Sequence, residues 1–247
     1  MVRIDPQRLP RHIAVIMDGN GRWAQKHTLG RISGHKKGAD SVRATVKACR
    51  KLGIRYLTLY AFSVENWLRP PEEVAALMAL LEEYVEKEID ELARNGIRLL
   101  IIGNISALRE PLRRKVRDAM RKTAHNRDMF LNVALSYGGR DEIVEASRKI
   151  LKDGLAGKIT PEDISKELFS RYLYTARIPD PDLLIRTSGE YRVSNFLLWQ
   201  MAYTEFYFTD VLWPDFRRKD LMEAIAAYQA RERRFGLTSD QLEKDRG

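Results

Sequence analysis

The order of apolar segments along this 247-residue chain constrains its fold more than any other feature of the sequence. Six short runs are almost continuously apolar or β-branched rather than alternating, which is typical of strands covered on both faces of a sheet. We therefore predict strands at residues 12–17, 56–62, 97–102, 130–137, 183–187 and 205–210.

The segments between these runs carry apolar residues at the spacing of amphipathic helices. Alternating strands and helices favour βαβ units and a mostly parallel sheet. Because no repeat, low-complexity tract or linker interrupts the pattern, we predict a single α/β domain over residues 1–247. Its six-stranded sheet is flanked by helices, and its tail beyond about residue 236 is expected to be flexible. The predicted helices lie around residues 39–49, 71–92, 108–120, 143–150 and 221–228.

Composition narrows the protein class. The single cysteine, Cys49, excludes an intrachain disulfide and favours a reducing compartment, so we expect a cytoplasmic protein. No apolar run approaches the roughly 20 residues needed to span a bilayer. The net charge is +9, and residues 22–55 alone hold ten basic side chains against one acid. Such a balance predicts an anionic partner, which composition leaves open among nucleic acid, a membrane surface and a phosphorylated small molecule.

Ligands of open parallel sheets bind beyond the carboxyl ends of the strands. The first predicted strand is followed by the hexapeptide DGNGRW, which begins at Asp18. Its glycines let backbone N–H groups approach an anion, Arg22 offers a planar fork of donors, and Asp18 suits Mg²⁺ together with phosphate oxygens. The hexapeptide therefore predicts a phosphate site, with a tight turn capped by Asp18 as the alternative.

A second polar group precedes the second predicted helix. Ser33 is a candidate N-cap, and Arg31 and His35 lie on either side of it. A helix N-terminus with cationic neighbours favours anion binding. A lone histidine at this position can equally be structural.

Polar residues also follow the second and fifth predicted strands. Ser63, Glu65 and Asn66 can position a proton or a water molecule, and Arg69 is a further phosphate candidate. Arg186 ends the fifth strand, where an unpaired charge is costly, so we expect it to meet an anion or an acid such as Glu205. With Arg192 six residues later, this segment predicts a second diphosphate-binding loop.

Five segments in this order resemble the cis-prenyltransferase family, and specifically its bacterial undecaprenyl diphosphate synthases. They are HIAVIMDGNGRWA, YAFSVENWLRP, SYGGRDEIV, RTSGEYRVSNFLLWQ and EFYFTDVLWPDF, and the resemblance runs from residue 11 to about 236. It implies an Mg²⁺-dependent enzyme that condenses isopentenyl diphosphate units onto an allylic diphosphate such as farnesyl diphosphate. The product that the resemblance implies is a long-chain cis-polyprenyl diphosphate, undecaprenyl diphosphate, which is the precursor of the lipid carrier for peptidoglycan synthesis.

The resemblance also implies roles for individual residues. Asp18 engages Mg²⁺ and diphosphate, Glu205 matches a second acid of the metal site, and Asn66 takes the position of the proton acceptor. An amide is a weak base, so we expect Asn66 to orient a water or the substrate, with the product's own diphosphate as a competing base. The implied substrate-binding residues are Gly19, Asn20, Gly21, Arg22, Trp23, Arg31 and His35 for the allylic diphosphate, Ser63, Val64, Glu65, Trp67 and Arg69 after the second strand, and Arg186, Arg192 and Ser194 for isopentenyl diphosphate.

The growing chain requires an apolar tunnel, which the resemblance places between helices and sheet. Small Ala75, Ala76 and Ala79 are candidates for setting its width. Tyr191 stands where bacterial relatives often carry a histidine treated as a metal ligand, which leaves metal binding at this position open. Activity is nevertheless expected, since no charged catalytic group is missing.

Partners follow from the same resemblance. A homodimer is implied, with an arginine among Arg231, Arg233 and Arg234 near the partner's diphosphate, and peripheral membrane association for product release is a hypothesis resting on the basic helix at residues 108–120. Nucleic acid is not expected, because residues 22–55 lack interleaved aromatic side chains. The alternatives that remain open are a relative without catalytic activity, which the presence of Asp18 argues against, and a cis-polyprenyl synthase of different product length.

Overall fold

Six parallel strands form one sheet in the order β3-β4-β2-β1-β5-β6 in the computed structural model, which describes residues 3–232. The predicted strands are confirmed to within two residues at each end. They are β1 His12–Ile16, β2 Tyr56–Ser63, β3 Ile97–Ile102, β4 Met129–Tyr137, β5 Leu183–Arg186 and β6 Glu205–Phe208. A parallel α/β fold is therefore confirmed.

The described helices include the five that were predicted and two short ones that were not. They are α1 Asn20–Lys26, α2 Arg31–Leu52, α3 Pro71–Arg94, α4 Glu110–Lys122, α5 Gly139–Leu155, α6 Lys166–Tyr172 and α7 Arg218–Gln229. Helix α1 begins with Asn20 and Gly21, which are poor helix formers, so tertiary packing rather than propensity stabilises it. The proposed N-cap role of Ser33 is wrong, because α2 begins at Arg31 with Gly30 as its N-cap.

Two helices define the face of the sheet that carries the site. Helix α2 ends at Gly53, whose φ of 86° is left-handed. Helix α3 begins at Pro71, a residue that suits the first turn because it lacks an N–H group. Both helices pack on the same side of β1, β2 and β3, through residues such as Val46 and Ile89.

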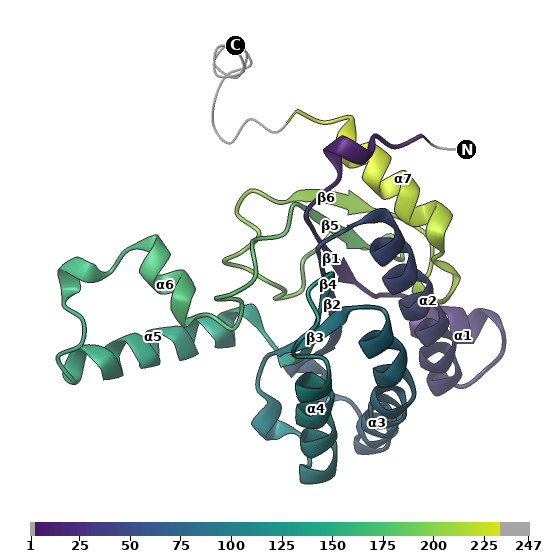
Figure 1. Cartoon of the computed structure of the whole chain (residues 1–247). Helices are drawn as coiled ribbons and strands as arrows, with labels where there is room; N and C mark the ends of the chain where they lie inside the picture. The colour runs from purple at the N-terminus through teal and green to yellow at the C-terminus, as the bar shows by residue number, and fades with distance from the viewer. Residues whose placement is uncertain (1–2, 233–247) are drawn as a thin grey trace.

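The opposite face of the sheet is covered differently. Ala14, Ile16 and Leu184 pack there against Phe196 and Leu197, which belong to an irregular segment and not to a helix. Figure 1 shows α5 and α6 projecting together away from the sheet, while α2, α3 and α4 lie against it. The long irregular segment between β5 and β6 thus returns to the sheet beside the carboxyl ends of the strands.

Within residues 3–232, no helix has the length and apolar character needed to cross a membrane. The predicted flexible tail, along with Arg233 and Arg234, lies outside the described residues.

Candidate active site

Asp18 and Arg186 form an ion pair at the carboxyl ends of β1 and β5. The two strands are parallel neighbours with Ile16 opposite Arg186, so the residues after them meet. Arg186 Nη2 donates to Asp18 Oδ2 at 2.9 Å, and the Arg186 side chain is 3% exposed. Its Nη1 donates to Ser194 Oγ at 2.8 Å and to the Arg192 carbonyl. The expectation that Arg186 meets an acid is confirmed, and that acid is Asp18 and not Glu205.

The turn after β1 is shaped by Gly19. Its φ is 105°, and a Cβ there would lie 2.9 Å from the Ser188 Cβ, so a larger residue is excluded. Gly19 N donates to Asp18 Oδ1 at 2.7 Å, and Gly19 offers no side chain to cap α1. The first-turn N–H groups of α1, at Asn20 and Gly21, are therefore left without a side-chain cap at the site, as an anion-binding helix start requires.

Glu190 holds two of the candidate diphosphate arginines together. It pairs with Arg22 at 3.0 Å and also with Arg192. Arg22 additionally donates to Ser188 Oγ. Sequence reasoning missed this role of Glu190, because nothing in the linear order indicates that residues 22 and 190 are neighbours.

Glu73 does the same for two further arginines, Arg69 and Arg31. Its carboxylate lies 3.1 Å from Arg69 Nη1 and 3.6 Å from Arg31 Nη1. Glu73 also belongs to the first turn of α3, where an acid interacts favourably with the helix dipole. Glu73 and Glu190 thus each hold two cationic side chains of the candidate site in place.

His35 is neutral at pH 7. Burial lowers its pKa to about 4, and the nearby charges of Arg69 and Arg31 act in the same direction, while Glu73 opposes them. The neutral ring can either donate or accept a hydrogen bond at the site. Its location inside a helix beside two arginines favours a role in substrate positioning over that of a cation.

The turn after β2 places Asn66 and Glu65. Asn66 Oδ1 accepts a hydrogen bond from Ser63 N at 3.0 Å, as part of a capping box. Glu65 accepts one from Asn195 Nδ2 at 2.8 Å. Burial acts to raise the pKa of Glu65, but hydrogen bonds from Asn195, its own backbone and Ser63 lower it overall. Glu65 is therefore a carboxylate at neutral pH.

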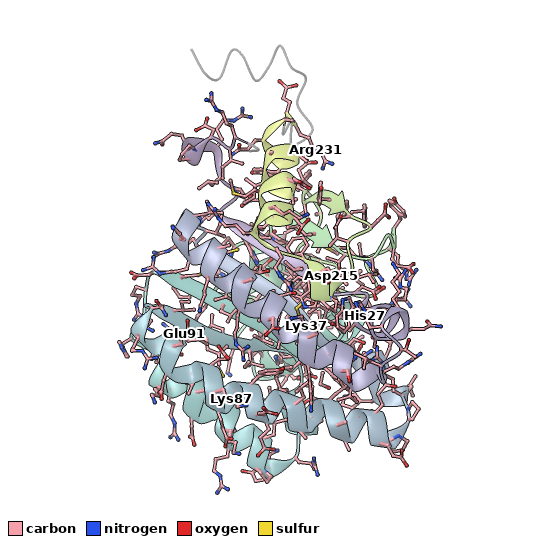
Figure 2. The ribbon with its side chains drawn as sticks, turned by 90° about the vertical axis from the view of Figure 1, so that its right-hand side faces the viewer. His27, Lys37, Lys87, Glu91, Asp215 and Arg231 are labelled. Carbon is pink, nitrogen blue, oxygen red and sulfur yellow. The ribbon has the colours of Figure 1, made fainter. Side chains whose placement is uncertain are left out.

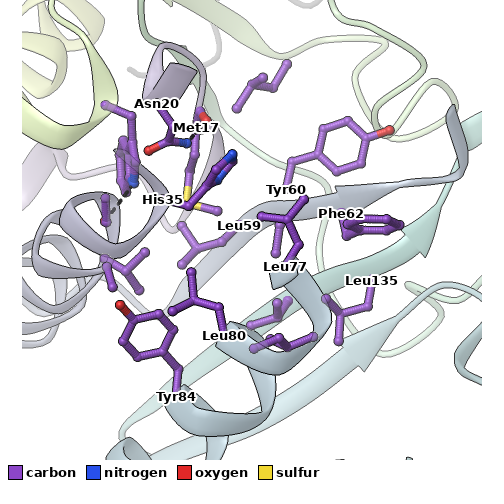
Figure 3. Close-up of a pocket in the computed structure, with 18 of the residues that line it drawn as sticks. Met17, Asn20, His35, Leu59, Tyr60, Phe62, Leu77, Leu80, Tyr84 and Leu135 are labelled. Atoms are coloured by element: carbon purple, nitrogen blue, oxygen red, sulfur yellow. Dashed lines mark hydrogen bonds between the residues drawn. The ribbon is translucent and has the colours of Figure 1, made fainter. Parts of the chain in front are cut away.

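A cavity of about 1570 Å³ joins these groups to an apolar interior. Figure 3 shows part of its wall, with Asn20, Met17 and His35 close together and the apolar side chains of Leu59, Leu77 and Leu135 further along. The residues of the predicted site that line it are Asp18, Gly19, Asn20, Gly21, Arg22, Arg31, His35, Ser63, Glu65, Asn66, Arg69, Arg186 and Ser194.

The cavity extends along the strands between α2, α3 and the sheet. It is lined at one end by Ser63, which is in register with Tyr137, and at the other by Ile97, which is in register with Met129. Eight residues of strand separate these levels, or about 26 Å at 3.3 Å per residue. The proposal that Ala75, Ala76 and Ala79 set the width of a tunnel is wrong for this cavity, since none of them lines it. The alanines in its wall are Ala39 and Ala61.

Ion pairs between α2 and α3 flank the outer side of the cavity. Arg43 Nε lies 2.5 Å from Glu88 Oε1, and Lys47 Nζ lies 2.9 Å from Glu91 Oε1. Figure 2 shows the two helices running side by side, with Glu91 labelled on α3. Helix α2 is rich in basic residues and α3 in acidic ones, and some of these opposite charges form ion pairs between the two helices.

Two predicted substrate-binding tryptophans lie away from the cavity wall. Trp23 donates from Nε1 to Asp215 Oδ1 at 2.9 Å and stacks on His27. Trp67 donates from Nε1 to Ser136 Oγ at 2.9 Å and packs edge-on against Phe62. Both indoles anchor the segments that carry site residues. Val64 and Arg192 are likewise not among the residues that line the cavity.

Glu205 and Asp18 are not brought together within the chain. Glu205 begins β6 opposite Leu183, the first residue of β5, whereas Asp18 lies beyond the last residues of β1. Glu205 Oε2 instead accepts from Arg231 Nη1 at 2.8 Å. Tyr191 is 75% exposed and its ring contacts Phe208.

The donors at the site fit Mg²⁺ held jointly with a substrate. Among residues 3–232, no group of three or more His, Cys, Asp or Glu side chains is arranged to hold a metal ion. Mg²⁺ is usually bound by one or two carboxylates with phosphate oxygens and water, so a complete protein cage is not required. The Asp18 side chain is 32% exposed and has a hard oxygen ligand to offer.

Comparisons with known proteins agree with this geometry. The family model described as "Putative undecaprenyl diphosphate synthase" matches residues 16–236. An isoprenyl transferase of Geobacter sulfurreducens is 54% identical over 237 residues, which cover 96% of each chain. The ditrans,polycis-undecaprenyl-diphosphate synthase ((2E,6E)-farnesyl-diphosphate specific) of Pasteurella multocida is 50% identical over 236 residues, 96% of this chain and 98% of that one.

A solved structure shares the fold. Lavandulyl diphosphate synthase from Lavandula x intermedia, in complex with dimethylallyl diphosphate, superposes with a TM-score of 0.91 at 39% identity, covering 93% of this chain and 99% of that one. The match of sequence and fold over nearly the whole length shows that the chain belongs to the undecaprenyl diphosphate synthase family of cis-prenyltransferases and is an enzyme that transfers prenyl groups.

Proposed function

We propose that this enzyme condenses isopentenyl diphosphate units onto farnesyl diphosphate, forming a cis double bond at each step and yielding undecaprenyl diphosphate, a precursor for the lipid carrier of cell-wall synthesis. The observation that carries the proposal is the Asp18–Arg186 pair at one end of a cavity of about 1570 Å³. A paired acid and cation suit a diphosphate with its counterion, and the apolar interior suits a hydrocarbon chain.

Two separate sets of residues bind the diphosphates of the two substrates. Arg22, Arg31 and the start of α1 bind the allylic diphosphate, because an uncapped helix start and planar guanidinium groups recognise phosphate oxygens. Arg186 and Ser194 bind isopentenyl diphosphate on the β5 side. Asp18 lies between the sets and would hold Mg²⁺ with the substrate oxygens.

Bond cleavage requires that the charge on the leaving diphosphate be offset. Mg²⁺ supplies part of that offset as a Lewis acid when it is bound. The arginines provide the remainder, and they are already held in place by Glu73 and Glu190, so little reorganisation is needed. Asn66 Oδ1 is engaged by Ser63 N, and we therefore assign Asn66 to orienting substrate or water near the proton that is lost.

Chain length is the finer part of the proposal. The cavity follows the strands from Ser63 to Ile97, which favours a long product over a single condensation. The alternative, a cis-polyprenyl synthase of another product length, is distinguished by the assay. The protein is incubated with radiolabelled isopentenyl diphosphate, farnesyl diphosphate and Mg²⁺, and the extracted product is sized by mass spectrometry. A C55 product supports the proposal, another length supports the alternative, and no extractable prenyl product contradicts both.

A homodimer is part of the proposal. The projecting α5 and the segment after it expose Val144, Leu151, Leu155 and Ile164, with Leu155 83% exposed. Exposed apolar side chains grouped on one arm favour contact with a second copy. Light scattering after gel filtration is expected to give the mass of two chains, and Leu151→Asp combined with Leu155→Asp is expected to shift it toward one.

We further propose that the protein binds membranes peripherally through α4. Arg114 and Arg117 are exposed on this amphipathic helix, while Leu112 and Val116 face the core. Pelleting with anionic liposomes is expected to weaken when Arg114 and Arg117 are both changed to Glu. Equal pelleting of the two proteins would remove this part and leave the catalytic proposal intact.

A further inference from the structure

The segment after Arg192 has an unusual backbone. Ser194, Asn195 and Leu197 have φ values of 47°, 62° and 44°, in the left-handed region that residues other than glycine rarely adopt. Asn is among the few side chains that tolerate this conformation. Tertiary contacts must therefore stabilise the segment, and those of Asn195 are the most extensive polar ones.

Asn195 connects three strand ends. Its Nδ2 donates to Glu65 Oε1 at 2.8 Å, at the end of β2. Its Oδ1 accepts from Arg140 N at 2.9 Å and its carbonyl accepts from Gly139 N at 2.7 Å, both beyond the end of β4. One residue of the segment after β5 thus binds to the segments after β2 and β4.

The approach of these segments is close. A Cβ on Gly138 would lie 2.7 Å from Asn195 Nδ2 and 2.8 Å from a Val64 methyl group. Only glycine permits this packing at position 138. The absence of a side chain at position 138 therefore leaves the space that the Asn195 side chain occupies between the three segments.

Ser194, the residue before Asn195, contacts the arginine of the candidate active site. Ser194 Oγ accepts from Arg186 Nη1, and the other terminal nitrogen of Arg186 contacts Asp18. The Ser194 carbonyl accepts from the Tyr60 hydroxyl at 3.3 Å. Because Asn195 follows Ser194 directly, the hydrogen bonds of Asn195 fix where the Ser194 hydroxyl lies relative to Glu65.

We propose that Asn195 is a positioning residue that keeps the Ser194 and Arg186 side of the site in register with Glu65, and so sets the affinity for isopentenyl diphosphate. This inference rests on the proposed function. It assigns Asn195 no contact with the reacting atoms.

Asn195→Asp is the most direct variant. Aspartate tolerates left-handed φ values and keeps an acceptor for Arg140 N, but it replaces the donor to Glu65 with a second carboxylate. We measure equilibrium binding of radiolabelled isopentenyl diphosphate in Mg²⁺, together with KM and kcat. The dissociation constant and the KM for isopentenyl diphosphate are expected to rise about tenfold, with a smaller change in the KM for the allylic substrate.

The matched control is Asn104→Asp. Asn104 is an exposed asparagine after β3 whose side chain accepts from Ser106 N, and it does not line the cavity. This variant is expected to bind isopentenyl diphosphate as the unmodified protein does. If Asn195→Asp fails to fold, Asn195→Gly restores backbone freedom without the side-chain contacts and is expected to show the same weakened binding.

Exchanging the amide of residue 195 and the carboxylate of residue 65 distinguishes a positioning role of Asn195 from a general loss of folding stability. In the double variant Asn195→Asp with Glu65→Gln, the glutamine amide can donate to the aspartate. Isopentenyl diphosphate binding is expected to return to within about threefold of Glu65→Gln alone. Binding by Asn195→Asp within twofold of the unmodified protein, or no recovery in the double variant, overturns the inference. If the unmodified protein neither binds isopentenyl diphosphate nor forms prenyl product, the proposed function fails first.

Discussion

Asp18 and Arg186 are 168 positions apart in the chain, yet Arg186 Nη2 donates a 2.9 Å hydrogen bond to Asp18 Oδ2. The contact follows from topology, because β1 and β5 are parallel neighbours and Ile16 is in register with Arg186. Arg186 is buried, and its Nε has no hydrogen-bond partner among the described residues. The pair thus places one acid and one nearly dehydrated cation where a diphosphate and its counterion would bind.

The shape of the Arg186 side chain is expected to matter as well as its charge. It contacts Asp18, Ser194 Oγ and the Arg192 carbonyl at once, which a single ammonium group cannot reproduce. Arg186→Lys is therefore expected to lower kcat/KM for isopentenyl diphosphate by about 100-fold. Steady-state kinetics test this, with thermal unfolding as the folding control. A folded variant within threefold of the unmodified enzyme would show that charge alone suffices.

Product length is expected to depend on the inner cavity. Ile89 of α3 is half-buried and lines the cavity toward its Ile97 end. Ile89→Trp adds volume that a packed wall cannot absorb without shifts, so shorter products are expected. Ala79→Trp is the matched control, because Ala79 is an exposed residue of the same helix outside the cavity. Mass spectrometry of the products reads out both, and unchanged lengths for Ile89→Trp would place the growing chain elsewhere.

Acid is expected to destabilise the fold through His12. Burial lowers its pKa to about 4, although a hydrogen bond with the Pro179 carbonyl opposes the shift. The neutral ring donates from Nδ1 to that carbonyl, which leaves Nε2 to accept from Thr58 Oγ1. Because the folded-state pKa is depressed from 6.5, this stability is present above pH 6.5 and is lost as the pH falls toward 4. The loss is about 3 kcal/mol for a shift of this size.

Urea unfolding at pH 7.5 and pH 4.5 measures the effect. His12→Gln is expected to be less stable at pH 7.5 and to lose less free energy of unfolding on acidification. His35, whose pKa is lowered in the same direction, contributes to the loss that remains. Equal losses for both proteins would assign the acid sensitivity to other groups.

Sheet and helices were predictable because their signals are local. Each strand is a short apolar run. Helix α2 ends at Gly53, and helix α3 begins at Pro71. Helix α1 was missed because its Asn20 and Gly21 oppose helix formation, and packing against α2 and Leu212 outweighs that preference. The packing of Phe196 and Leu197 on one face of the sheet could not be predicted either, because no local sequence pattern indicates that an irregular segment covers a sheet.

The site was predictable only as a set of strand ends. A parallel sheet places the ends of β1 and β5 at the same edge, but neither segment indicates that the two strands are neighbours, so the sequence offered Glu205 rather than Asp18 as the acid for Arg186. The bridging roles of Glu73 and Glu190, and the place of Asn195 between three segments, depend on contacts between positions far apart in the sequence. Trp23 shows a further limit of the linear motif, since it is adjacent to Arg22 in the sequence but its indole donates to Asp215.

Prenyl transfer at the Asp18–Arg186 site is tested most directly by one comparison. Incorporation of radiolabelled isopentenyl diphosphate into extractable product is measured with farnesyl diphosphate and Mg²⁺ for the unmodified protein and for Asp18→Asn, which keeps the size of the side chain and removes its charge. Product from the unmodified protein and a loss of at least about 1000-fold in the variant are expected. A folded Asp18→Asn protein that retains rates within tenfold of the unmodified enzyme would contradict the account.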